Sequence, residues 1–276
     1  MSNLLRQYHP CLPLAGFVQA YWTGDFNRNG TSGISQRVVP NGCLELIIHL
    51  TGDHCALSKY EHWDRSPDFT LIGLFTHAYE VRFPTRVQVF GIRFHPEGIH
   101  TVFGIPPAVL QGSYEDSTKV LGRRFGDYCS RLRDCRDIGE KIALTDNFLM
   151  KQLEMNRSGY DYTGQAAGLI RKCQGLLPLE ALTGQVAISP RQLQREFKKR
   201  YGITAKAYMR LARLNAVQDY LQQTNVPDFS YIAHLHGFSD QSHFIREFKS
   251  YTGNNPGSFA RKRQEFIVNA AKMTFQ

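Results

Sequence analysis

The chain has 276 residues, of which 42% are hydrophobic, and its formal net charge is +9. This length suits two domains with a core each, and no run approaches the roughly 18 apolar residues of a transmembrane helix, so no membrane association is expected. The first residues, MSNLLRQYHPCLPLAGF, lack a basic segment followed by a long apolar one. We therefore expect no secretion signal and a cytoplasmic location.

The excess positive charge lies at one end of the chain. Residues 168–276 hold 16 Lys and Arg residues against 7 Asp and Glu residues, whereas residues 1–167 hold 17 of each kind. Such segregation is typical of a chain in which one domain meets a polyanion and the other does not. A generally solubilising basic surface is the alternative.

Residues 1–97 are predicted to form a β-rich domain. The runs GFVQAYWTGDF, DFTLIGLF, AYEVRF and RVQVFGIRFHP have the length of strands, and Asn41–Gly42 lies between two β-rich runs, which indicates a hairpin. Regular short strands with turn signals favour a barrel or a sandwich. Trp22, Tyr21 and Phe94 are candidates for lining a small-molecule site in its interior, and each is equally explained as plain core.

No cofactor, metal or catalytic site is indicated. The six cysteines form no CxxC pair, which fits neither a zinc ribbon nor a dense disulfide framework; they are Cys11, Cys43, Cys55, Cys129, Cys135 and Cys173. The closest approach to a cupin metal site is FHPEGIH, but Pro96 and Gly98 interrupt its strand. A phosphate loop, a G-x-S-x-G elbow and an H-E-x-x-H motif are missing from the sequence. We expect a protein that is not an enzyme.

The pattern becomes helical beyond residue 97. The segments EGIHTVFGI, TKVLGRRFGDYCSRLRD and GEKIALTDNFLMKQLEM place a helical region at residues 98–156. A linker is predicted at residues 157–167, a second domain at 168–265 and a tail at 266–276.

The second domain contains an internal repeat. The phrases RQLQREFKKRYG (191–202) and QSHFIREFKSYTG (241–253) both contain Arg-Glu-Phe-Lys and end in Gly. Leu193 and Phe197, like Phe244 and Phe248, are four residues apart and form one apolar stripe on each helix. N-caps are predicted at Ser189 in the first copy and at Ser239 or Asp240 in the second.

A shorter helix is predicted before each of these helices, at LEALTGQVAI (179–188) and FSYIAHLHGF (229–238). In the second of these, Ile232, Ala233 and Leu235 are expected to point inward and Gly237 to form a tight turn. Helix, short turn, helix is the helix-turn-helix pattern, and the chain carries it twice.

One long helix is predicted to connect the two units. The segment from Thr204 to Thr224 repeats apolar residues every three or four positions, with Thr204 as its N-cap. A helix of about 19 residues spans roughly 28 Å. Because successive major-groove turns on one face of DNA lie about 34 Å apart, such a helix could place both units in adjacent major-groove segments.

Residues 170–265 resemble the DNA-binding domain of the AraC/XylS family of bacterial transcription regulators. The resemblance rests on SPRQLQREFKKRYGIT, YMRLARLNAVQDYL and IAHLHGFSDQSHFIREFKSYTGNNP, and the last follows the family signature Ile-Ala-x-x-x-Gly-Phe-Ser-x-x-Ser-x-Phe-x-Arg-x-Phe-Lys. The first unit departs at Thr183 and Ala187, where the family usually has Ala and Gly. The resemblance implies an N-terminal sensor domain of β-barrel type, and helices that dimerise.

The outward positions of the two recognition helices are the candidate DNA contacts. Base-facing candidates are Arg191, Gln194, Arg195, Gln241, Ser242, His243 and Arg246, because Arg reads guanine and Gln reads adenine. Phosphate candidates are Lys198, Lys199 and Lys249. Glu196 and Glu247 are expected to pair with a nearby Arg or Lys, and His234 and His236 to be surface or packing residues. The ARKR segment at residues 260–263 is either a phosphate anchor or a charged helix end.

The sequence thus predicts two domains: a β-barrel-like N-terminal domain with following helices, and an all-α C-terminal domain of two helix-turn-helix units joined by a long helix. The predicted function is a sequence-specific DNA-binding transcription regulator. The partners considered are double-stranded DNA, a small-molecule effector, RNA polymerase if the protein activates, and a second copy of the chain. The alternatives are a zinc-dependent DNA alkylation-repair protein, which would need four clustered cysteines, and a regulator without a ligand.

Overall fold

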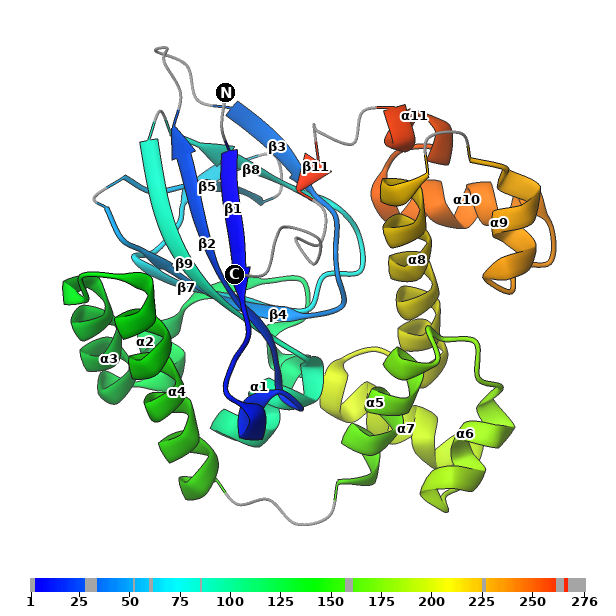
Figure 1. Ribbon diagram of the computed structural model, residues 1–276. Helices are drawn as coiled ribbons and strands as arrows, with labels where there is room; N and C mark the ends of the chain where they lie inside the picture. Colours follow the sequence, from blue (N-terminus) through cyan, green and yellow to red (C-terminus); the bar gives the residue numbers. More distant parts are fainter. Residues whose placement is uncertain are drawn as a thin grey trace.

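The chain forms two domains that lie side by side in the computed structural model (Figure 1), which describes residues 3–27, 34–51, 53–59, 62–84, 86–156, 161–224, 227–261 and 266–267. The N-terminal domain contains two β-sheets and four α-helices, and the C-terminal domain is helical. The predicted fold class is therefore confirmed. None of the helices within these ranges is long and apolar enough to cross a membrane.

Two sheets build the N-terminal domain. The large sheet has the strand order β1 (Asn3–Tyr8), β2 (Val18–Asn27), β9 (Arg86–Phe94), β4 (Leu44–His49), β7 (Phe69–Ile72) and β10 (Tyr114–Asp116). The small sheet has the order β11 (Phe266–Ile267), β3 (Ile34–Val38), β8 (Tyr79–Phe83), β5 (Ala56–Lys59) and β6 (His62–Arg65). β10 extends the large sheet from within the stretch predicted as helical, and β11, from the predicted tail, pairs in parallel with β3.

Alternation along β4 gives the large sheet two buried faces. Leu44, Leu46 and Ile48 join the core shared with the helices, while Ile47 and His49 point toward the small sheet. Successive side chains of a strand point to opposite faces, so one strand serves both layers. A second, smaller core lies between the two sheets and contains residues from both.

The hairpin predicted at Asn41–Gly42 is wrong. β3 pairs with β8 in the small sheet, whereas β4 pairs with β7 and β9 in the large sheet, so the turn between them is a corner that changes sheets. Gly42 has a φ of +72°, and the side chain of Asn41 accepts a hydrogen bond from the amide of Cys43 (2.9 Å). An Asx turn of this kind suits a corner as well as a hairpin.

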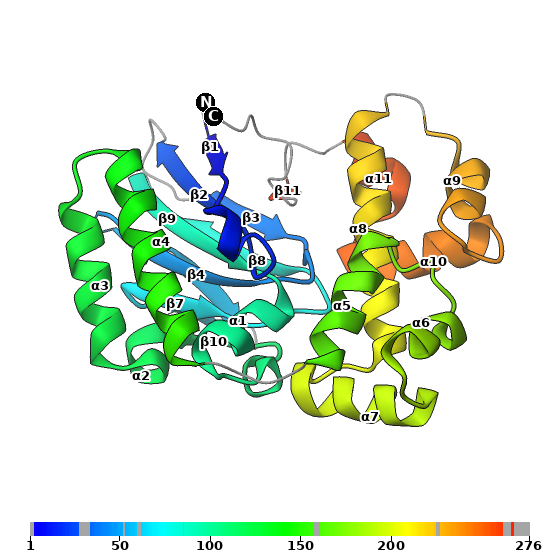
Figure 2. The same cartoon turned by 60° about the horizontal axis from the view of Figure 1, so that its bottom comes forward.

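Helices cover the outer face of the large sheet (Figure 2). They are α1 (Pro96–Phe103), α2 (Ser117–Leu121), α3 (Arg123–Asp134) and α4 (Ile138–Met155), with short 3₁₀ segments η1 (Leu12–Leu14) and η2 (Pro107–Leu110). Gly122, at φ +77°, separates α2 from α3. The rings of Tyr128 and Phe148 stack at 4.2 Å between α3 and α4.

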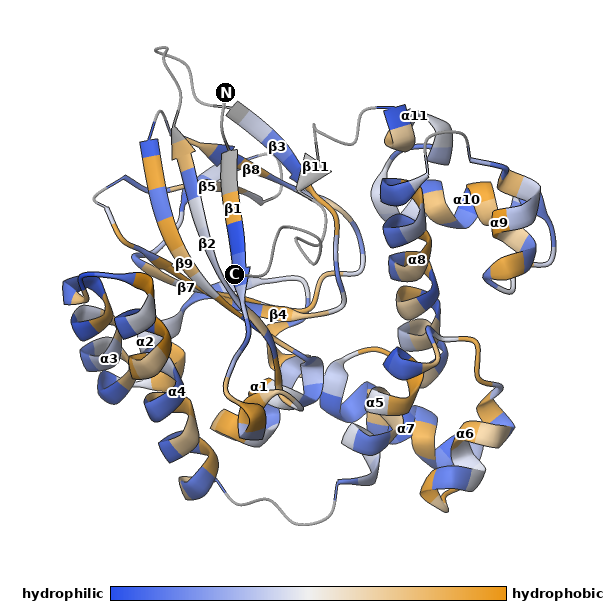
Figure 3. Ribbon diagram, viewed as in Figure 1, coloured by the Kyte–Doolittle hydropathy of each residue, from blue (hydrophilic) through white to orange (hydrophobic). Residues whose placement is uncertain are grey.

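The C-terminal domain consists of α5 (Tyr162–Lys172), α6 (Leu179–Val186), α7 (Pro190–Tyr201), α8 (Ala205–Gln223), α9 (Phe229–Leu235), α10 (Gln241–Thr252) and α11 (Pro256–Arg261). α5 begins inside the stretch predicted as a linker, where Asp161 caps it by accepting from the amide of Gly164 (2.9 Å). In Figure 3 apolar and hydrophilic residues alternate around these helices, as expected for helices with one buried face.

Buried polar contacts join the two domains. Arg171 of α5 forms an ion pair with Glu97 of α1, and Glu97 is only 6% exposed. Burial raises the pKa of the Glu97 carboxyl, while the guanidinium of Arg171 pulls it down. Further along the interface, Tyr251 of α10 contacts Pro40 through its hydroxyl group.

Candidate nucleic-acid interface

Two helix-turn-helix units lie at opposite ends of α8 (Figure 1). The first consists of α6 and α7, and the second of α9 and α10. Leu193 and Phe197 of α7, and Phe244 and Phe248 of α10, are fully buried, as the repeat predicted. The opposite faces of α7 and α10 are therefore the ones presented to solvent.

Capping defines where each recognition helix starts and stops. Ser189 accepts from the amide of Gln192 (3.2 Å) at the start of α7, and Asp240 accepts from the amide of His243 (2.8 Å) at the start of α10. Gly202 and Gly253, both at φ +76°, end the two helices. These caps confirm the predicted helix ends.

The turns of the two units share one backbone conformation but differ in residue. Ala187 follows α6 at φ 55°, and Gly237 occupies the equivalent place in the second turn at φ +68°. A left-handed conformation is favourable for glycine and costly for alanine. The departure at Ala187 thus leaves the turn geometry intact and places strain in the first unit.

The supporting helix α9 differs from expectation at one position. Ile232 and Ala233 are buried as predicted, but Leu235 is 41% exposed, so its predicted inward orientation is wrong. α9 ends at Leu235, and the chain then turns so that His236 takes the buried place, with its ring 6.2 Å from that of Tyr220. His234 is exposed.

α8 holds the second unit through polar contacts. Arg210 forms an ion pair with Glu247 of α10 (3.1 Å), and Arg213 donates to the carbonyl of Gly237 (3.0 Å). Glu196 pairs with Arg195 (3.2 Å), so both glutamates of the repeated Arg-Glu-Phe-Lys phrase have the basic partner predicted for them. α8 has 19 residues and starts at the predicted cap, Thr204.

On α7, two of the three base-facing candidates are exposed to solvent, although one of them, Arg195, also contacts Glu196. Arg191 is exposed, and the side chain of Arg195 is 73% exposed. Gln194 is half-buried, and its side-chain oxygen accepts from the amide of Lys206 at the start of α8 (3.5 Å). Gln194 would have to leave that contact to reach a base.

On α10, Arg246 is exposed and forms no hydrogen bond or ion pair within the part of the chain that the structure describes. Ser242 is also exposed. Gln241 accepts from the hydroxyl of Ser230 (2.8 Å), and His243 contacts Ser239 and Glu247 with its two ring nitrogens. Gln241 and His243 therefore already bind neighbouring residues of their own unit.

The phosphate candidates divide in the same way. Lys199 and Lys249 are exposed near the ends of their helices. The Lys198 amine donates to the carbonyl of Gly202 (2.5 Å), where it caps the C-terminus of α7. Of the ARKR segment, Ala260 and Arg261 end α11, and the remaining two residues lie outside the described ranges.

A second candidate site is a cavity of about 100 Å³ between the two sheets. Its apolar lining includes Trp22, Phe26, Leu57, Ile72, Val81 and Val89. Of the three aromatic residues proposed from the sequence, Trp22 lines it, whereas Tyr21 and Phe94 are buried in the core on the helix side of the large sheet.

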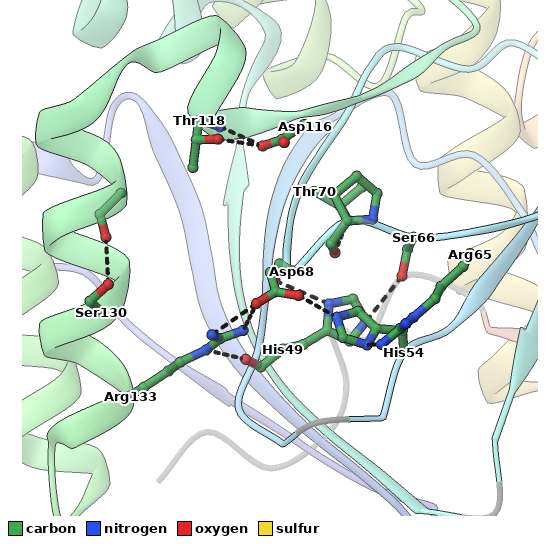
Figure 4. A network of polar contacts seen from close by, with 12 residues as sticks. His49, His54, Arg65, Ser66, Asp68, Thr70, Asp116, Thr118, Ser130 and Arg133 are labelled. Atoms are coloured by element: carbon green, nitrogen blue, oxygen red, sulfur yellow. Dashed lines mark hydrogen bonds and ion pairs between the residues drawn. The ribbon is translucent and has the colours of Figure 1, made fainter.

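A polar network includes His49, one of the residues that line this cavity (Figure 4). Arg133 of α3 donates to the carbonyl of His49 (2.7 Å) and, with two nitrogens, to the carboxylate of Asp68 (3.0 Å each). His54 also contacts Asp68 (2.6 Å). Partial burial opposes the charge of Asp68, but the hydrogen bonds from His54 and Arg133 prevail and lower its pKa.

The cysteines are all free thiols, and burial raises the pKa of Cys43 and of Cys55 to about 12. Across the described ranges, no group of three or more His, Cys, Asp or Glu side chains is arranged to hold a metal ion.

Two family models match the chain. One, described as a helix-turn-helix domain, matches residues 182–262, and the other, a domain of unknown function (DUF6597), matches residues 6–116. The bifunctional transcriptional activator/DNA repair enzyme AdaA of Bacillus subtilis is 39% identical over 97 residues, which are 35% of this chain and 46% of AdaA. The multiple antibiotic resistance protein MarA of Escherichia coli is 33% identical over 75 residues, 27% of this chain and 58% of MarA.

The chain thus spans about half the length of the curated relatives it matches. Among solved structures, ToxT from Vibrio cholerae aligns with 87% of this chain and 98% of its own, with a TM-score of 0.48 and 11% identity. The AraC-like transcriptional activator CuxR aligns with 78% of this chain and 79% of its own, with a TM-score of 0.36 and 13% identity.

Proposed function

We propose, on the basis that this chain is an AraC-family protein with two helix-turn-helix units, that it is a sequence-specific DNA-binding transcription regulator. The observation that carries the proposal is the pair of recognition helices, α7 and α10, which present exposed arginines at the two ends of one connecting helix. Each helix enters a major groove, and α8 holds the two at a constant separation.

The exposed side chains fall into two groups, one that contacts bases and one that contacts phosphates. Arg191, Arg195 and Arg246 read bases, because a guanidinium can donate two hydrogen bonds to guanine. Lys199 and Lys249 contact phosphates, which gives affinity that falls with salt. Ser242 stays a base candidate, while Gln194, Gln241, His243 and Lys198 support the geometry of the units unless DNA draws them out of their present contacts.

The test is genome-wide capture of DNA bound to the intact protein, with the double variant Arg195→Ala/Arg246→Ala beside it. A matched control is Arg123→Ala/Arg124→Ala, which removes the same charge from exposed positions of α3. We expect peaks with a shared motif of two elements about one helical turn apart, lost in the first variant and kept in the control. Diffuse binding that is the same in the Arg195→Ala/Arg246→Ala variant as in the unaltered protein would contradict the proposal.

Affinity measured on one such site separates the two kinds of contact. Arg246→Ala is expected to cost roughly 1–3 kcal/mol on the specific site, with less effect on unrelated DNA. Lys199→Ala is expected to weaken binding to all sequences and to reduce the salt slope by about 1. An Arg246→Ala loss that is equal on both kinds of DNA would contradict base reading.

The N-terminal domain is proposed to modulate DNA binding, with the cavity between the sheets as the site of a small-molecule effector. Binding there would shift the arrangement of the domains that can hold DNA. Contacts with RNA polymerase and with a second copy of the chain belong to the same proposal, as does association with the nucleoid.

An enzymatic role, as a zinc-dependent DNA-repair protein, is the alternative raised by the likeness to AdaA. That match covers 35% of this chain, and within the described ranges no three of the cysteines come together in a group that could hold a metal ion. Metal analysis of the purified protein distinguishes the two functions. One tightly bound zinc ion per chain would favour the repair enzyme, and a chain without zinc would favour the regulator.

A further inference from the structure

The last strand of the chain returns to the N-terminal domain. β11 pairs in parallel with β3, with Phe266 opposite Arg37 and Ile267 opposite Val38, and Figure 1 shows it beside β3. Because β8 pairs with the other side of β3, β11 is the outermost described strand of the small sheet. Residues 266–268 are Phe, Ile and Val, which are favoured in strands. An added strand of this kind binds through main-chain hydrogen bonds.

β11 is closely tied to the second helix-turn-helix unit. α11 ends at Arg261, and its Phe259 is fully buried, with its ring 5.2 Å from that of Phe248 in α10. Phe266 follows Arg261 by five residues, so the Cα atoms of these two residues can be at most about 18 Å apart. While β11 stays paired with β3, the second unit can therefore move only a short distance from the small sheet.

The residue opposite Phe266 also touches the second recognition helix. A Cβ atom added to Gly253, at the end of α10, would lie 2.8 Å from Nη1 of Arg37. The guanidinium of Arg37 is thus at the C-terminus of α10, where a positive charge is favourable. Its other nitrogen, Nη2, pairs with Glu80 of β8 (3.2 Å). Arg37 therefore meets β11 through its backbone and α10 through its side chain.

Further contacts hold the same end of α10 on the N-terminal domain. The amide of Ala78 donates to the carbonyl of Tyr251 (3.1 Å). The hydroxyl of Tyr251 contacts the carbonyl of Pro40, and the side chain of Asn215 in α8 donates to the carbonyl of Asn41 (2.7 Å). The second unit is therefore docked through the last turn of α10 and through α8.

The docked end of α10 is not the end that carries the candidate DNA contacts. Tyr251 and Gly253 lie at its C-terminus, whereas Ser242 and Arg246 lie in its first half and are exposed. Docking on the small sheet therefore leaves these two candidates uncovered.

We propose that β11 is a latch: by pairing with β3 it holds the second helix-turn-helix unit on the small sheet, and this restraint preorganises α10 for binding DNA. The latch itself stands on the strand pairing and on the contacts of α10 and α8. Its effect on DNA rests on the proposed function, since it needs α10 to be a recognition helix. Restraining a binding element in its bound conformation raises affinity, because less freedom is lost on binding.

The latch is tested by hydrogen exchange at the amide of Ala78, because its acceptor lies in the other domain. In the full-length variant Phe266→Pro/Ile267→Pro, both residues lose the amide hydrogen that strand pairing needs. We expect the Ala78 amide to exchange at least about fivefold faster, which is the net effect of one backbone hydrogen bond. The amide of Ile92, in the strand between β2 and β4, is expected to keep its exchange rate.

A matched control is Ala270→Pro/Ala271→Pro, which places two prolines in the same tail after the paired residues. We expect this control to leave Ala78 exchange unchanged. A chain that ends at Glu265 lacks β11 without containing new prolines, and it decides the question should the proline variant unfold, which faster exchange at Ile92 would report. Unchanged Ala78 exchange in the variants without β11, or an equal increase in the control, would overturn the latch.

The effect on DNA is measured with the same variants on a specific site of two elements and on unrelated DNA. Without the latch the second unit has to be ordered on binding, so we expect the affinity for the specific site to fall at least about fivefold, with the control unchanged. Faster Ala78 exchange with equal or tighter specific binding overturns the preorganisation and leaves the latch. If the unaltered protein shows no specific binding, the regulator function fails and the latch still stands.

Discussion

The ion pair between Arg171 and Glu97 gives a sharp test of how the two domains are held together. Replacing Arg171 by methionine keeps most of the apolar stem and removes the guanidinium. Glu97 is 6% exposed, and its Oε2 has no hydrogen-bond partner among the described residues, so little else compensates its charge. Breaking a buried pair from one side costs about 3–5 kcal/mol.

The lower end of that range applies, because the Arg171 side chain is 27% exposed and water reaches part of the pair. A loss of about 3 kcal/mol lowers the melting temperature by roughly 6–12 °C in a chain of this size. Urea unfolding at pH 8 and pH 5 measures it. Without Arg171 the pKa of Glu97 in the folded state rises further above its unfolded value of about 4.3, so the folded protein takes up a proton on acidification. The deficit is therefore full at pH 8 and shrinks toward pH 5.

Two further variants complete this test. Glu97→Gln combined with Arg171→Met leaves no buried charge, and we expect it to be more stable at pH 8 than Arg171→Met alone. Arg200→Met breaks the pair with Asp161, in which both side chains are more than a fifth exposed, and its loss is expected to be about 1 kcal/mol. A loss below about 1 kcal/mol for Arg171→Met, or a deficit that does not change with pH, would refute the picture of a buried, uncompensated carboxylate.

Three other changes have defined outcomes. Ala187→Gly relieves a left-handed alanine, and after the entropy cost of glycine in the unfolded chain we expect a gain of roughly 0.5–1 kcal/mol in urea unfolding; a loss would contradict the strain. Ser189→Ala removes the cap of α7 and is expected to cost about 1 kcal/mol, whereas Ser189→Asp keeps it. Burial lowers the pKa of His236, so the folded state binds fewer protons and stability falls as the pH drops below the unfolded value of about 6.5. His236→Phe should remove part of that acid sensitivity. A variant whose free energy of unfolding falls with pH as steeply as that of the unaltered protein would contradict this role of His236.

The recognition helices and their connection were accessible from the sequence because their signals are local. Ser189 and Thr204 mark starts, Gly202 and Gly253 mark ends, and the paired Leu and Phe residues mark the buried face within a single helical turn. Each of these is decided by neighbours within four residues, which is the range over which sequence patterns carry information.

The corner at Asn41–Gly42 was beyond that range. A turn signal states that the chain reverses or bends, and the partners that decide which strand pairs with which lie elsewhere. Here the carbonyl of Asn41 meets Asn215, 174 residues further along the chain. β6 was not predicted from the sequence for another reason. Its four residues are mostly exposed, so the sequence shows no alternation of apolar and polar residues there.

The candidate DNA contacts were predicted at the level of the helix face, and the structure separates them further. Lys198 and Gln194 have outward positions by spacing, yet each finds an acceptor or donor in its own domain. Helical periodicity gives the direction in which a side chain leaves the helix. It does not say which partner the terminal group of that side chain contacts, because that partner can belong to a neighbouring element of the fold.

The length of α8 has a consequence for where binding sites are to be sought. Under the proposed function, the two recognition helices belong to one chain and stand in a fixed order, so the DNA element that one copy reads has a direction and requires no twofold symmetry. An insertion of five base pairs between the two elements would turn one of them to the far side of the duplex, where no rearrangement of a single rigid helix can follow. The spacing between the two halves of the element read by one chain is therefore a fixed parameter of the search, and that element is not itself an inverted repeat.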